Sequence, residues 1–190
     1  TSVGVVARVE EFSGDLQERE SVFRHAIASQ PWVRAQLESA KQEGELRLTR
    51  NYSYYGAATG KPGLMLCGDA FAFLDPVFSS GMYIALSSGA KAADLIADAL
   101  RGDAGREEVG LSYEKWFTTH IEPMRRLIYA FYDPEFSVGR LMRDRPDLRG
   151  DLTDILVGHL GREFSELMSE LGARTASPTP LAEKLHGGAR

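Results

Sequence analysis

The chain of 190 residues is 43% hydrophobic and 26% charged, which is typical of a globular domain, or of a large piece of one, rather than of a disordered segment. Its formal net charge of −5 argues against a nucleic-acid surface, because such a surface needs a concentrated basic stripe. The single cysteine, Cys67, excludes a disulfide framework within one chain and favours a cytoplasmic location, and no segment resembles a signal sequence or a membrane span.

The chain starts with a strand-like segment. In residues 1–10, Val3, Val5, Ala7 and Val9 alternate with mostly polar or small neighbours, a pattern that indicates a half-buried strand. A strand at the very start of a chain needs neighbours to pair with. We therefore expect the chain to be the C-terminal part of a larger protein.

Residues 14–63 predict two helices, a strand and a turn. Apolar residues at helical spacing predict a helix over 14–29, with Asp15 as its N-cap and Pro31 ending it. A shorter helix is expected over 32–42. The alternating segment 45–55 predicts a strand, and the glycines and proline of 57–63 predict a turn.

The segment from residue 64 onwards has an unusual order of elements. Residues 64–67 predict a short, fully apolar strand buried in a sheet, which ends at Gly68-Asp69. An irregular loop with Asp75-Pro76 follows, and a long helix opens at Ser79-Ser80-Gly81. Glycine allows close approach to the backbone, and an aspartate there can accept bonds from sugar or polyol hydroxyls. The first N–H groups of the helix favour an anion, so this segment predicts half of a cradle for a large cofactor.

The rest of the chain predicts helices. Residues 107–133 have apolar positions at helical spacing, and Pro123 is expected to start or kink a helix there. Residues 146–173 predict two shorter amphipathic helices, and the tail 177–190 is rich in helix breakers. We expect an α/β region over 1–102 and a mostly helical region over 103–190.

The motif between Gly68 and Gly81, GDAxxxxDPxxSxG, resembles the C-terminal flavin-binding motif of FAD-dependent monooxygenases and halogenases. The segments NYSYYG and CGDAFAFLDPVFSSGMYIAL resemble the halogenase branch more closely, and within it the enzymes that act on phenols, pyrroles or carrier-bound aromatics. The resemblance implies that residues 1–102 are the C-terminal part of an FAD-binding monooxygenase-like fold. The pyrophosphate-binding Gly-x-Gly-x-x-Gly loop and the lysine linked to halogenation would then lie upstream of Thr1.

The resemblance also implies site residues. Asp69 would bind the ribityl chain, Pro76 would border the flavin, and Met82 would lie close to its ring. Gly68 and Ser79 would complete the cofactor site together with Gly81. Ser80 and Gly81 would offer backbone N–H groups to the halide. No catalytic side chain is assigned within the chain, which alone is expected to be inactive.

The function implied is chlorination of an electron-rich aromatic compound in antibiotic or other secondary metabolism, with FADH2, oxygen and chloride. A separate flavin reductase would supply FADH2, and whether the substrate is tethered to a carrier protein stays open. Tryptophan halogenases carry glutamate where this chain has Phe78, which argues against free tryptophan as substrate. Two alternatives remain: a flavin-dependent hydroxylase or oxidoreductase of the same superfamily, and a non-catalytic fragment.

Two further groups of residues bear on partners and metals. Arg140, Arg143, Arg145 and Arg149 form a basic cluster that could dock an acidic carrier protein, although Asp144 and Asp147 favour an ordinary solvated face. The four histidines are far apart in the sequence without ligand spacing, so no metal site is expected.

Overall fold

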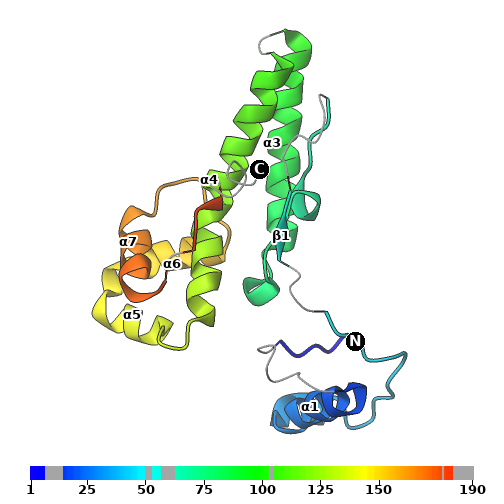
Figure 1. Cartoon of the computed structure of the whole chain (residues 1–190). Coiled ribbons are helices and arrows are strands. Elements are labelled where there is room, and N and C mark those ends of the chain that lie inside the picture. The colour runs from blue at the N-terminus through cyan, green and yellow to red at the C-terminus, as the bar shows by residue number, and fades with distance from the viewer. Residues whose placement is uncertain (7–14, 50–52, 57–62, 103–104, 177, 182–190) are drawn as a thin grey trace. The chain divides into compact units, whose positions relative to one another are not determined.

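The computed structural model describes residues 1–6, 15–49, 53–56, 63–102, 105–176 and 178–181, and every statement below concerns these residues (Figure 1). The chain divides into two compact units, Thr1–Asn51 and Tyr52–Arg190, which are described separately. No helix in the described part of the chain is long and apolar enough to cross a membrane.

The first unit contains the two helices that the sequence predicts. Helix α1, Leu16–Ala28, starts with a capping box: the Asp15 carboxylate accepts the Gln17 and Glu18 N–H groups at 2.9 Å each, and the Glu18 carboxylate accepts the Asp15 N–H at 3.1 Å. The predicted N-cap is confirmed. Helix α2, Pro31–Gln36, is shorter than expected. Pro31 occupies its first turn, where proline is tolerated because the missing N–H would have no helical partner.

The predicted strands of the first unit are not present in its described residues. Residues 1–6 and 45–49 belong to neither a helix nor a strand, and residues 7–10 of the first predicted strand lie outside the described part. An extended segment becomes a strand only when a neighbour pairs with its N–H and C=O groups. No such neighbour lies beside these segments in the described part of this unit.

The second unit begins with a two-stranded antiparallel ladder. Strand β1, Tyr54–Tyr55, pairs with β2, Ala72–Phe73, so that Tyr54 lies opposite Phe73 with their rings stacked at 6.0 Å. Of the strand predicted over 45–55, these two tyrosines alone pair in the described structure.

The prediction of a buried strand over 64–67 is wrong. These residues carry no strand assignment, Leu64 is exposed, and the other three are half-buried. The Leu66 carbonyl accepts the Tyr113 hydroxyl at 2.8 Å, so part of this backbone bonds to a helix side chain instead of to a strand. The predicted turn at 57–62 lies outside the described residues.

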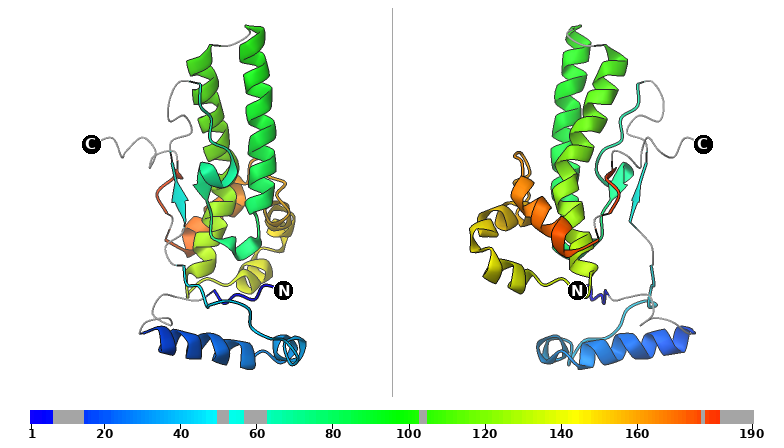
Figure 2. Two further views of the ribbon diagram at one scale, coloured as in Figure 1. Left: turned by 90° about the vertical axis from the view of Figure 1, so that its right-hand side faces the viewer. Right: turned by 60° about the vertical axis from the view of Figure 1, so that its left-hand side comes forward.

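Two long helices form the centre of the second unit. Helix α3, Gly81–Arg101, and helix α4, Arg106–Tyr132, run side by side in opposite directions (Figures 1 and 2). Pro123 lies inside α4 and does not start a helix. A proline costs about 3 kcal/mol in a helix interior, but buried neighbours such as Ile121 and Leu127 each contribute about 1.5–3 kcal/mol and offset that cost.

Three short helices pack beside α4. They are α5, Val138–Asp144, α6, Arg149–Leu156, and α7, Ser165–Arg174 (Figure 2). The two helices predicted over 146–173 are confirmed as α6 and α7, whereas α5 was not predicted. All three place leucine or isoleucine side chains in the core of the second unit: Leu141, Leu152, Ile155, Leu167 and Leu171.

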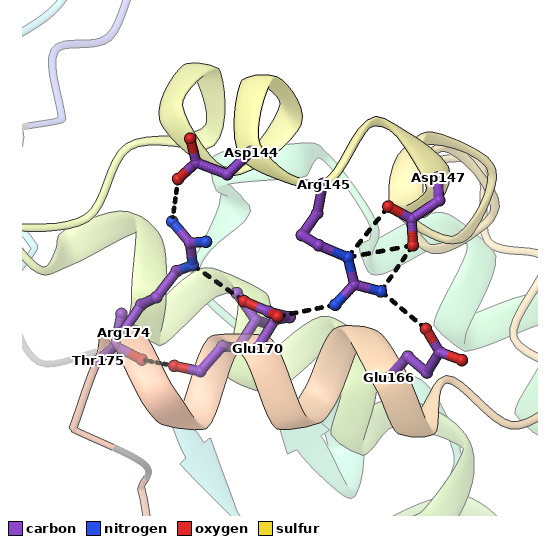
Figure 3. A network of polar contacts seen from close by, with 8 residues as sticks. Asp144, Arg145, Asp147, Glu166, Glu170, Arg174 and Thr175 are labelled. Carbon is purple, nitrogen blue, oxygen red and sulfur yellow. Dashed lines mark hydrogen bonds and ion pairs between the residues drawn. The ribbon is translucent and has the colours of Figure 1, made fainter.

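Arg145, the residue that follows α5, forms ion pairs with the 3-10 turn η4, Pro146–Leu148, and with α7 (Figure 3). Its guanidinium donates to Asp147 at 2.6 Å, to Glu166 at 2.8 Å and to Glu170 at 2.7 Å, and Glu170 also pairs with Arg174. These bonds, with Asp147 first, raise the pKa of Arg145. Arg174, and after it Arg145, lowers the pKa of Glu170. Arg145 is therefore committed to intramolecular pairing, which weakens the idea of a basic docking patch.

The compact units do not divide where the sequence predicts two functional regions. The predicted boundary between residues 102 and 103 falls within the second unit, where α3 and α4 pack together across it. The assignment of cofactor binding to 1–102 and of a separate role to 103–190 stays a prediction.

Candidate functional site

Gly68 brings the backbone against helix α3. It opens the 3-10 turn η2, Gly68–Ala70, with φ at +52°, a region that favours glycine. A Cβ at this position would lie 2.9 Å from both Cα and Cβ of Ala85. The buried Gly68 N–H donates to Ser88 Oγ at 2.8 Å. Glycine is therefore required here both for the backbone conformation and for the close approach to α3.

Asp69 lies next to the start of α3. Its carboxylate Oδ1 is 3.8 Å from the position that a Cβ on Gly81 would take. Its carbonyl accepts the Tyr54 hydroxyl at 2.6 Å, which ties this loop to β1. The structure thus brings together Asp69 and Gly81, two of the residues predicted to form one site.

The loop between Asp69 and α3 is shaped by a strained turn. The 3-10 turn η3, Pro76–Phe78, follows Asp75, whose carboxylate accepts the Ser53 hydroxyl. Ser79 comes next with φ at +54°, the one positive φ among the non-glycine residues that the structure describes. Such strain persists only when the surroundings impose it, and it clusters at functional sites. Here it turns the chain from η3 into α3.

The first turn of α3 leaves backbone donors without a side-chain cap. Ser80 takes the N-cap position and is buried, but its hydroxyl makes no capping hydrogen bond. Gly81 is exposed, and Met82 retains 77% of its accessible surface. The first N–H groups of any α-helix have no intrahelical acceptor and lie at the positive end of the helix dipole.

These features define what the site can do chemically. The Asp69 carboxylate can accept hydrogen bonds from hydroxyl groups, and the first turn of α3 can donate to an anion or to a negatively charged ring edge. A cofactor with a polyol chain and a negatively charged edge fits this set of donors and acceptors. A free anion at Gly81 would lie near the Asp69 carboxylate, so its binding is favoured when that carboxylate is engaged by hydroxyl groups.

A second cluster, which was not predicted from the sequence, is formed by Tyr83, Trp116 and His120. The Tyr83 hydroxyl and His120 Nε2 are 2.8 Å apart, and the Trp116 ring stacks on His120 with centroids at 4.6 Å. Burial lowers the pKa of His120, and burial also raises the pKa of Tyr83. Tyr83 and His120 are separated by 37 residues on two different helices, so no local pattern connects them.

The protonation of His120 predicts how stability depends on pH. Because its folded-state pKa lies below the ordinary value of 6.5, the unfolded chain binds this proton more readily than the folded chain. The contribution of neutral His120 to stability is complete above about pH 6.5 and is lost as the pH falls below that value. We expect the free energy of unfolding to fall less between pH 7 and pH 5 in His120→Gln than in the parent protein. Urea denaturation at several pH values checks this, and equal losses in both proteins would contradict it.

Comparisons with known proteins show which family the chain resembles. A family model described as squalene epoxidase matches residues 23–126, more than half of the chain. The chain is 35% identical to the flavin-dependent halogenase otaD of Aspergillus niger over 54% of its own length, and 31% identical to the sulochrin halogenase gedL of Aspergillus terreus over 63%. It is 27% identical to a tryptophan 2-halogenase of Chondromyces crocatus over 70% of its length.

A solved structure shows the same fold. The flavin-dependent brominase Bmp2 superposes with a TM-score of 0.67 at 23% sequence identity, covering 87% of this chain and 44% of that one. The matches with the three halogenases span 23%, 22% and 26% of the length of those relatives.

The family model and the solved structure define the fold as that of a part of a flavin monooxygenase-like protein. The chain belongs to the family that the squalene epoxidase model describes, and it matches the C-terminal part of a flavin-dependent halogenase.

Proposed function

We propose that this chain forms the flavin- and halide-facing part of a flavin-dependent halogenase. The observation that carries the proposal is the meeting of the Asp69 carboxylate with the uncapped first turn of α3 at Gly81. The names of the relatives support a flavin cofactor and halogenation. Bound flavin would supply the activation of oxygen that lets a halide be oxidised.

Each of the predicted site residues has a defined role in this proposal. Asp69 accepts hydrogen bonds from the ribityl hydroxyls, and Gly68 holds that loop against α3. Pro76 and Ser79 shape the loop that borders the flavin. The N–H groups of Ser80 and Gly81 receive the halide, and Met82, exposed on the same turn, covers the ring.

The proposed substrate is an electron-rich aromatic compound, and the proposed halide is chloride. Phe78 precedes the strained Ser79 and packs edge-on against Phe131 at 5.8 Å. Phe131 stays 53% exposed, so the pair presents an apolar aromatic surface next to the proposed site. An aromatic substrate can pack against such rings. A separate reductase would supply the reduced flavin, and attachment of the substrate to a carrier protein is left to experiment.

Product analysis of the full-length protein tests the proposal. The protein is supplied with a flavin reductase, FAD, NADH, oxygen and a panel of phenols and pyrroles, with chloride or bromide added. We expect a halogenated product whose mass and isotope pattern follow the halide supplied. Hydroxylated product without halogen would instead identify an aromatic hydroxylase. Consumption of neither substrate nor reduced flavin in the panel would leave a non-catalytic role.

Replacing Asp69 with alanine should weaken FAD binding. Loss of charge-assisted hydrogen bonds to hydroxyl groups costs about 1.5–3 kcal/mol, which corresponds to about a 10- to 150-fold higher Kd. The matched control is Asp94→Ala, which removes an exposed carboxylate from α3 and leaves the loop that carries Asp69 unchanged. Fluorescence titration of FAD measures both variants. Equal effects in the two variants would remove Asp69 from the site.

A further inference from the structure

We propose that Tyr83 is a positioning residue for the first turn of α3. His120 of α4 and Gly158, just after α6, clamp its side chain. Through Tyr83, the helical C-terminal region therefore fixes the position of that turn. The proposal rests on the proposed function, because this turn is where the flavin and the halide would bind. It gives the helices beyond α3 a defined role in the site.

The first side of the clamp is a hydrogen bond to α4. Tyr83 follows Met82 in the first turn of α3, and its hydroxyl lies 2.8 Å from His120 Nε2. The Trp116 ring stacks on the His120 ring with centroids at 4.6 Å, whereas the Tyr83 ring, tilted by 26° with centroids at 6.1 Å, approaches its edge through the hydroxyl at Nε2. The imidazole is thus held at one face by Trp116 and at its edge by the contact with Tyr83. His120 is also followed directly by Ile121, one of the core residues of α4.

The second side of the clamp is the backbone of Gly158. This glycine is buried with φ at +82°, and a Cβ there would lie 2.7 Å from Cδ2 and 2.8 Å from Cγ of Tyr83. The Tyr83 ring therefore lies against bare backbone. Gly158 is joined to α6 by its N–H, which donates to the Ile155 carbonyl at 3.2 Å, and Ile155 is fully buried.

The two contacts have one consequence for the site. The Tyr83 hydroxyl contacts His120 of α4 and the Tyr83 ring contacts Gly158, just after α6, while the backbone of Tyr83 belongs to the turn that contains Gly81 and Met82. A shift or rotation of that turn must move the ring against either His120 or Gly158, and both are anchored in the core. The first turn of α3 is thus ordered by residues distant in sequence. A binding site needs such neighbouring residues because they hold the ligand-contacting groups in place.

Hydrogen exchange and flavin titration of the full-length protein test the hydrogen-bonded side. We expect the amides of residues 79–86 to exchange about two- to tenfold faster in Tyr83→Phe and in His120→Leu, each of which deletes one hydrogen bond. The FAD Kd should rise by a similar factor. His120→Gln, whose amide oxygen can accept the same O–H, should remain within about twofold of the parent. Tyr129→Phe on the outer part of α4 is the control and should match the parent.

A pair of glycine variants tests the other side. Gly158→Ala and Gly102→Ala place alanine at nearly the same φ, +82° and +84°, but a Cβ at Gly102 meets nothing within 4 Å. Both should be less stable, whereas only Gly158→Ala should speed exchange in residues 79–86 and weaken FAD binding.

The outcomes separate this inference from the proposed function. If these variants lower the melting temperature but leave the exchange of residues 79–86 and the FAD Kd as in the parent, Tyr83 is purely structural and the inference is overturned. If FAD binds and follows the expected pattern but no substrate is halogenated, the positioning role stands while the halogenase proposal fails.

Discussion

Replacing Gly68 with alanine is expected to destabilise the protein by about 2–5 kcal/mol, the sum of left-handed backbone strain and of overpacking against α3. The new Cβ would meet the Cα of Ala85 at 2.9 Å, and a backbone atom in the middle of a helix cannot move aside cheaply. Displacing η2 would also stretch the bond from the Gly68 N–H to Ser88 Oγ. Phe71, fully buried and packed on Phe117 at 4.3 Å, would move with it.

Thermal and urea unfolding of the full-length protein measure this effect. Gly63→Ala is the matched control, because Gly63 has φ at +86° and open space around its Cβ position. It should cost only the backbone strain, about 1–2 kcal/mol. If Gly68→Ala is as stable as Gly63→Ala, η2 and α3 can move apart at little cost, and the expected overpacking at Gly68 is wrong. FAD affinity should fall with Gly68→Ala, since Asp69 is carried on the same turn.

Replacing Gly81 with proline should abolish halogenation, with a loss of at least about 100-fold, the size found when one oxyanion-hole donor is removed. Gly81 is the first residue of α3, where an N–H has no helical acceptor and proline is tolerated. The substitution therefore removes a donor from the proposed site with a limited cost to the helix. Part of that cost arises at Ser80, whose ψ of −10° is disfavoured before proline.

Two variants separate loss of the donor from loss of the fold. Gly81→Ala keeps the N–H, and its Cβ would meet only Asp69 Oδ1 at an ordinary 3.8 Å, so halogenation should persist. Ser80→Ala should also retain most activity, because the Ser80 hydroxyl makes no capping bond. Rates of halogen incorporation and melting temperatures are measured for all three. If Gly81→Pro retains halogenation while melting close to the parent, the halide does not depend on this N–H.

The sequence by itself determined the features that arise from neighbouring residues. The Asp15 cap and α1 depend on side chains three or four positions apart, and α6 and α7 show the same local periodicity. The motif between Gly68 and Gly81 also carries the resemblance to the FAD-dependent monooxygenases and halogenases. Such motifs are readable because a glycine turn and a helix start each require particular residues at fixed positions.

Tertiary structure alone decided the features that need distant partners. Residues 64–67 have the composition of a strand, but no strand pairs with them in the described part of the chain, and Tyr113 bonds their backbone instead. Helix α4 runs through Pro123 because the burial of neighbouring side chains outweighs the free-energy cost of a proline inside a helix. The contacts of Tyr83 with His120 and Gly158 join elements that no local pattern relates. Strand pairing and core packing depend on residues that lie far apart in the sequence and meet only in the folded chain. A sequence pattern, in contrast, covers only residues that are close together in the sequence.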